Sequence, residues 1–225
     1  MLKSITGYIK DTRTPVYSFI AIFPLIILYD ILVLLTKPSY VARAGLWADW
    51  FLSLVRINTV FGKIAFVTLV FLFFAFISLR NKKTQIRAVY FPVMVIESIF
   101  YAYFFSNAVF FIKKSLMLSV FSSSDGLVLS IGAGFYEELF FRFIPMMILR
   151  LSVKNGDKKT LLVLVTILTS SLLFSLFHYI GPEAFSFESF IYRFISSVIL
   201  FIIFITRGFG IAVYTHTIYD LMCFY

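Results

Sequence analysis

The chain has 225 residues, of which 61% are hydrophobic and only 14% are charged. Soluble domains carry about 25% charged residues, and the 30 Phe and 13 Tyr of this sequence hold more apolar surface than one small core can bury. This composition excludes a soluble globular domain, a disordered chain and a disulfide-stapled module, and it predicts a multi-pass membrane protein. Basic cytoplasmic loops account for the net charge of +9, so no nucleic-acid partner is expected.

Apolar stretches that could cross a bilayer recur along the chain, since a membrane helix needs about 20 such residues. The first is 17–35. Residues 43–58 mix Trp and Leu with Arg and Asp, which is typical of a helix lying in the membrane interface. Further spans are predicted at 64–79, 89–112, 127–149, 161–180, 190–206 and 208–224. The predicted fold is an all-α polytopic transmembrane helix bundle of about seven spans (six to eight) plus one interfacial helix.

No linker divides this bundle, so residues 1–225 are predicted to form one integral membrane domain, with the motif-bearing half at 127–224. The distribution of Lys and Arg predicts its orientation. These residues are about twice as frequent in the segments that face the cytoplasm when the N-terminus is inside. We therefore expect a cytoplasmic N-terminus.

Polar residues inside the spans indicate where function lies, because each charged group costs at least about 2.5 kcal/mol at the membrane centre. The stretch 127–149 contains Glu137, Glu138 and Arg142. Glu138 and Arg142 are four residues apart, so they share a helix face and are predicted to form an ion pair. Glu137 lies about 100° further around the helix and is available to another partner. A purely structural reading is that the pair fastens this helix to a neighbour.

The two histidines of the chain, His178 and His216, both fall in predicted spans. Either one alone could be a hydrogen-bonded packing residue. His216 and Asp220 are four residues apart on one helix face, so they could bind a shared ligand or each other.

These residue types suit the hydrolysis of a peptide bond. A carboxylate in an apolar site can act as a general base near neutral pH, an imidazole can hold the attacking water, and further donors can stabilise an oxyanion. Glu137, His178 and His216 could supply these groups. The same three side chains could instead bind zinc, which takes two His and one Glu in many peptidases, although no H-E-x-x-H spacing is present.

Three short motifs follow one another along the last spans: Glu137-Glu138-x-x-x-Arg142, Phe174-x-x-x-His178 and His216-x-x-x-Asp220. This set resembles the motifs of the CPBP family, which comprises the type II CAAX prenyl endopeptidases and related bacterial intramembrane glutamic proteases, including bacteriocin-processing and immunity proteins. The resemblance implies that Glu137 is the water-activating base and that His178 shares this water. It implies a supporting role for Glu138 and Arg142.

His216 and Asp220 fall where the family places its oxyanion-stabilising His and a following Asn or Asp. An ionised Asp has no hydrogen to donate to an oxyanion. We therefore expect Asp220 to orient His216, which then acts as the donor.

The resemblance implies an intramembrane endopeptidase in a bacterial inner membrane that cleaves a membrane-associated peptide or protein, with no cofactor and no metal. Two alternatives stay open. One is a non-catalytic scaffold or bacteriocin-immunity-type protein with the same fold, and the other is a zinc-dependent membrane peptidase. The sequence does not indicate whether the substrate is prenylated.

Overall fold

The computed structural model describes residues 2–36, 86–116, 126–153, 158–180 and 184–224. Within these ranges the chain is almost entirely helical and contains no strand, which confirms the all-α fold class. The predicted interfacial helix at 43–58 and the predicted span at 64–79 lie outside the described residues. The expected total of about seven spans is therefore left as a prediction.

The elements are α1 (Leu2–Thr12), α2 (Pro15–Thr36), α5 (Tyr90–Leu116), α6 (Gly126–Glu138), the π-helix η1 (Leu139–Phe143), α7 (Ile144–Ser152), α8 (Lys159–Phe177), α9 (Phe187–Arg207) and α10 (Phe209–Phe224). Four of them, α2, α5, α8 and α9, are long and apolar enough to cross a membrane. In α2, α5 and α8 the apolar residues lie all around the helix rather than on one stripe, as in helices surrounded by apolar groups. The protein is accordingly an integral membrane helix bundle.

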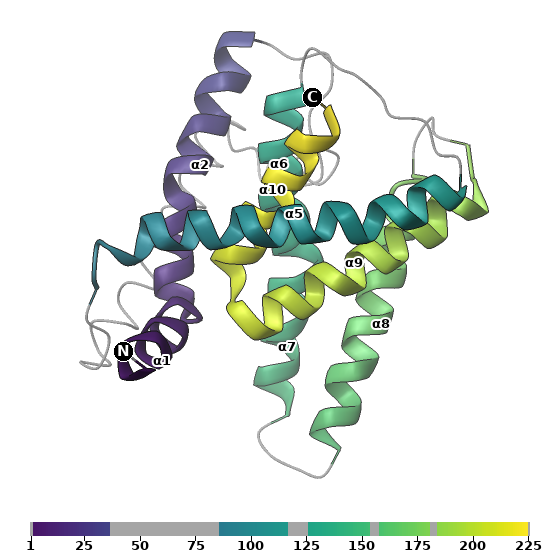
Figure 1. Cartoon of the computed structure of the whole chain (residues 1–225). Coiled ribbons are helices and arrows are strands. Elements are labelled where there is room, and N and C mark those ends of the chain that lie inside the picture. The colour runs from purple at the N-terminus through teal and green to yellow at the C-terminus, as the bar shows by residue number, and fades with distance from the viewer. Residues whose placement is uncertain (1, 37–85, 117–125, 154–157, 181–183, 225) are drawn as a thin grey trace, which may run out of the picture.

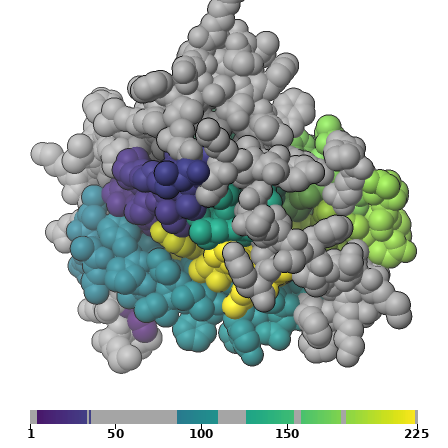
Figure 2. Space-filling view, turned by 90° about the horizontal axis from the view of Figure 1, so that it is seen from above, coloured from purple at the N-terminus to yellow at the C-terminus, as the bar shows by residue number. Residues whose placement is uncertain are grey.

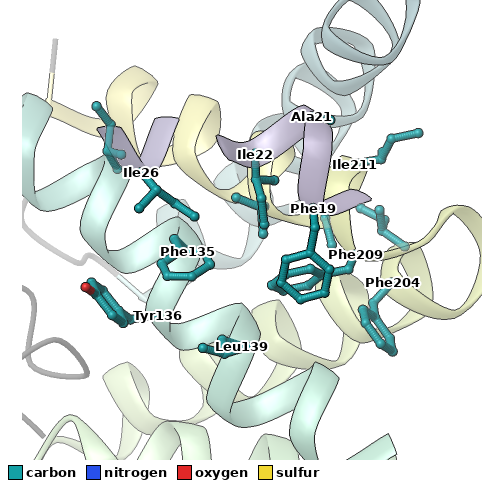
Figure 3. Packing of buried hydrophobic residues seen from close by; sticks show 14 of the residues in the cluster. Phe19, Ala21, Ile22, Ile26, Phe135, Tyr136, Leu139, Phe204, Phe209 and Ile211 are labelled. Carbon is teal, nitrogen blue, oxygen red and sulfur yellow. The ribbon is translucent and has the colours of Figure 1, made fainter. Parts of the chain in front are cut away.

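The C-terminal helix α10 lies at the centre of this bundle and packs against α6, α5, α2 and α9. Figure 1 shows α5 running across α2 and α10, and the view from above shows α10 between α5 and α6 (Figure 2). Buried aromatic and aliphatic side chains fill the space between these helices. In Figure 3, Phe19, Ile22 and Ile26 of α2 face Phe135 of α6 and Phe209 of α10.

Local sequence signals set the ends of α9. Ser186 caps its N-terminus by accepting a hydrogen bond from the backbone N–H of Ser189. Gly208 follows its last residue with a φ of +96°, a conformation that glycine adopts without steric cost. A Cβ at Gly208 would also lie 2.9 Å from the Cα of Arg13. This glycine therefore permits both the sharp turn into α10 and the close approach of the α1–α2 connection.

Gly134 allows a close contact between α6 and α10. A Cβ at this position would lie 2.1 Å from the Thr217 Oγ1 atom and 2.9 Å from the Thr217 backbone nitrogen. Small residues are the usual means by which membrane helices approach one another. Because Thr217 follows His216, this contact also sets the distance between the two helices that carry Glu137, Glu138 and His216.

We expect Gly134→Ala to lower the free energy of unfolding by about 1–3 kcal/mol, because the added methyl group overpacks the α6–α10 contact. Gly7→Ala is the matched control, since a Cβ at Gly7 meets no atom within 4 Å. Adding Thr217→Ala to Gly134→Ala should recover only part of the loss, because the backbone nitrogen stays in the way. Thermal unfolding of the purified variants in detergent measures the effect. Equal unfolding temperatures for Gly134→Ala and Gly7→Ala would show that the helices can separate at no cost.

Candidate active site

The two adjacent acids and Arg142 are placed by an irregular stretch of helix. The sequence predicts one continuous helix at 127–149, but the structure interrupts it with the π-helix Leu139–Phe143, which begins directly after Glu138 and contains Arg142. In this wider turn, the backbone N–H of Ile144 bonds to the carbonyl of Leu139, five residues earlier. Single π-turns occur frequently at functional sites.

Proline explains part of this irregularity. Pro145 has no backbone N–H and cannot bond to the carbonyl of Phe141, four residues before it. The hydroxyl of Ser170 in α8 donates a hydrogen bond to that carbonyl instead. Side chains of neighbouring helices commonly satisfy carbonyl groups that proline frees inside membranes. The break is therefore tied to the packing of α8.

Glu138 and Arg142 form the ion pair that their spacing predicts. Both side chains are fully buried, and Arg142 Nη1 lies 3.2 Å from Glu138 Oε1. Arg142 also donates a hydrogen bond of 2.8 Å to Ser197 Oγ in α9, and its guanidinium lies 4.5 Å from the centre of the Phe174 ring in α8. Arg142 thus fastens this helix to two neighbours, which is the structural role considered from the sequence.

His216 lies between the two acids. Its Nδ1 is 2.8 Å from Glu138 Oε1 and donates to it, because an ionised carboxylate only accepts hydrogen bonds. Its Nε2 is 3.9 Å from Glu137 Oε2 and 3.6 Å from Asp220 Oδ2. Asp220 was expected to orient the His216 ring, but Glu138 also contacts this ring and lies closer to it than Asp220 does. Glu138 lies 78 residues before His216, so this contact arises from tertiary packing.

His178 lies directly after α8 and is half-buried. Its Nδ1 is 2.9 Å from the backbone carbonyl of Phe174 and donates to it, since a carbonyl only accepts. When the ring is neutral, this bond leaves the lone pair on Nε2. Phe174 lies between the two histidines, because the centre of its ring is 4.8 Å from that of His178 and 6.4 Å from that of His216.

Glu137 is buried, with 7% of its surface exposed. It stands at the C-terminal end of α6, directly before Glu138, whose carboxylate is engaged by both Arg142 and His216. The two neighbouring acids therefore have different surroundings. Glu138 holds two cationic or donating partners, whereas Glu137 faces the far nitrogen of His216 across 3.9 Å.

Sequence reasoning did not single out Ser197 or the central position of Phe174. Ser197 belongs to a Ser-Ser pair within a mostly apolar predicted span, and a polar pair of this kind is a signal for helix–helix hydrogen bonding. Phe174 is part of the second motif, but its contact with Arg142 depends on how α8 packs against η1. For the zinc alternative, no group of three or more metal-ligating side chains is arranged around a common point within the described part of the chain.

Comparison with known proteins relates the chain to one family. The described helices define a membrane protein with a buried carboxylate–histidine cluster, and residues 119–222 match the family model Type II CAAX prenyl endopeptidase Rce1-like. This match confirms the resemblance that the three motifs carry, and it makes residues 119–222 similar to the type II CAAX prenyl endopeptidases. At the level of this family, the similarity is to a membrane protease. No curated protein and no solved structure matches the chain.

Proposed function

We propose that the protein is an intramembrane endopeptidase in which Glu137 activates a water molecule for attack on a peptide bond. The observation that carries this proposal is the different placement of the two adjacent acids. Glu138 is occupied by an ion pair of 3.2 Å and a hydrogen bond of 2.8 Å, whereas Glu137 lies 3.9 Å from His216 Nε2. That separation exceeds a direct hydrogen bond and allows one oxygen atom to lie within reach of both groups.

In the proposed reaction, Glu137 removes a proton from the water as its oxygen attacks the carbonyl carbon. The carbonyl π bond breaks and its electron pair forms an oxyanion. His216, as an imidazolium held by Glu138 at Nδ1, donates a hydrogen bond from Nε2 to this oxyanion. The tetrahedral intermediate then collapses, the C–N bond breaks, and Glu137 returns its proton to the leaving amine. His178 is proposed to hold the same water through Nε2.

The proposed substrate is a membrane-associated peptide or protein, and the proposed location is a bacterial inner membrane with the N-terminus in the cytoplasm. The cluster lies among helices that are long and apolar enough to span a bilayer, which supports a scissile bond at or near the membrane. Exposed basic residues in α1 and at the start of α8 support the proposed orientation: Lys10, Lys158 and Lys159.

Comparative proteomics of membrane fractions tests the proposal in cells. A strain that carries Glu137→Gln should accumulate at least one uncleaved precursor that the wild type processes. Glu188→Gln is the matched control, because Glu188 is an exposed acid on α9 whose carboxylate accepts a hydrogen bond from Ser186. The absence of any difference between the Glu137→Gln and wild-type strains would contradict a proteolytic role for this residue.

Two further measurements address the alternatives. If Glu137→Ala/His178→Ala complements a deletion strain, the protein acts as a non-catalytic scaffold or immunity-type protein rather than as a protease. Metal analysis of active protein distinguishes the zinc-dependent mechanism. We expect full activity at zero bound zinc after strong chelation, and loss of activity on chelation with recovery on adding zinc would favour the metallopeptidase.

A further inference from the structure

The N-terminal helix α1 has one face that packs on the bundle and a second, apolar face that is exposed. With 11 residues it is about 16 Å long, which is too short to cross a bilayer. Tyr8 and Thr12, four residues apart, face the bundle, and Thr12 has no exposed surface. Ile5 and Ile9, also four residues apart, are 47% and 37% exposed. Two large aliphatic side chains therefore form an outward stripe beside the face that packs on the protein.

A buried polar network outside the candidate active site fixes the rotation of α1. The Tyr8 hydroxyl donates a hydrogen bond of 2.6 Å to Glu97 Oε2 in α5. Glu97 also receives two hydrogen bonds from Arg207 at the end of α9, one of them 2.8 Å long from Nη2. The Arg207 guanidinium lies 5.4 Å from the centre of the Tyr8 ring and contacts the Thr12 hydroxyl at 3.4 Å. Helices α5 and α9 thus hold α1 with its isoleucines directed outward.

The connection to α2 determines where this stripe lies relative to the membrane. Only Arg13 and Thr14 separate α1 from α2, whose apolar segment Pro15–Val33 is long enough to span a bilayer. Figure 1 shows α1 at the lower end of α2, at the same end of the molecule as the C-terminal end of α7 and the N-terminal end of α8. A helix that is only two residues from the end of a span starts close to the bilayer surface.

The positive charge beside the stripe is complementary to an anionic lipid surface. Lys10 is exposed and directly follows Ile9 in α1. Amphipathic helices that combine an apolar face with flanking Lys and Arg bind interfaces by inserting the apolar side chains and pairing the cations with phosphate groups.

We propose that α1 is an interfacial helix that binds anionic phospholipids, with Ile5 and Ile9 among the acyl chains and Lys10 at the headgroup phosphates. This role differs from that of the predicted interfacial helix at 43–58 and does not depend on proteolysis. Gly7 and Ile9 are two residues apart and therefore point in directions about 200° apart on the helix. Since a Cβ at Gly7 meets no atom within 4 Å, this position offers a probe on the opposite side of α1.

Fluorescence quenching in the full-length chain tests the proposal. A Cys223→Ser background carries either Ile9→Cys or Gly7→Cys, labelled with a small fluorophore and placed in nanodiscs of equal phosphatidylcholine and phosphatidylglycerol. Bromine is attached to the acyl chains of one lipid or the other. We expect the Ile9→Cys label to be quenched by brominated lipid, more strongly when the bromine is on phosphatidylglycerol, and the Gly7→Cys label to be quenched by aqueous iodide.

Lys10→Gln should remove the preference for phosphatidylglycerol, whereas Lys159→Gln, an exposed lysine on another helix, should leave it unchanged. If Lys10 is retained and the two brominated lipids quench the Ile9→Cys label equally, the proposal of anionic selectivity is overturned. Iodide quenching of both labels, or shielding of the Ile9→Cys label from lipid and iodide alike, would overturn the interfacial position. The second of these results would indicate a protein partner or a second copy on this face.

Discussion

Replacement of Arg142 by Ala should lower the free energy of unfolding by about 3–5 kcal/mol, because it leaves the Glu138 carboxylate buried without its cation. Neither side chain of this pair has any exposed surface, so solvent cannot take the place of the missing partner. The variant also loses the hydrogen bond to Ser197 and the contact with the Phe174 ring. We expect activity to fall as well, since Glu138 holds His216.

A double variant distinguishes the effect of losing the ion pair from the effect of leaving one charge buried without a partner. Glu138→Gln/Arg142→Gln removes both charges and should recover part of the stability that either single substitution loses. Thermal unfolding of the purified proteins in the same detergent provides the comparison. A double variant less stable than both single variants would show that these two residues contribute independently rather than as a pair.

Glu137→Gln should have the opposite profile. Loss of a general base lowers a rate by about 10²–10⁴-fold, while an amide of the same shape fits the buried position without leaving a charge behind. We therefore expect proteolysis to disappear and the unfolding temperature to stay close to that of the wild type. If Glu137→Gln and Arg142→Ala destabilise the protein equally, then the roles of the two acids are reversed or both acids are structural.

Local features of this fold could be predicted from the sequence because they depend on helix periodicity. The Glu138–Arg142 pair follows from a spacing of four residues, and the described spans follow from the length of apolar stretches. The close approach at Gly134 follows from the absence of a side chain, although only the structure identifies Thr217 as its neighbour.

Features that depend on distant partners could not be predicted in this way. The bond between Glu138 and His216 joins residues 78 positions apart, so the sequence favoured the nearer Asp220 as the partner of the histidine. Arg207 directly follows the predicted span 190–206, a position that is typical of a basic residue at the cytoplasmic surface. The structure instead buries it against Glu97, 110 residues away. The π-turn was missed because it results jointly from Pro145 and from packing against α8.

The most direct measurement is cleavage of the accumulated precursor by purified protein reconstituted in lipid. The precursor identified in Glu137→Gln membranes serves as the substrate, and mass spectrometry follows the appearance of the new chain end. We predict that the wild-type protein and Glu188→Gln cleave it at similar rates, whereas folded Glu137→Gln is slower by at least about 100-fold. Cleavage by Glu137→Gln at the wild-type rate would contradict the assignment of Glu137 as the residue that activates water.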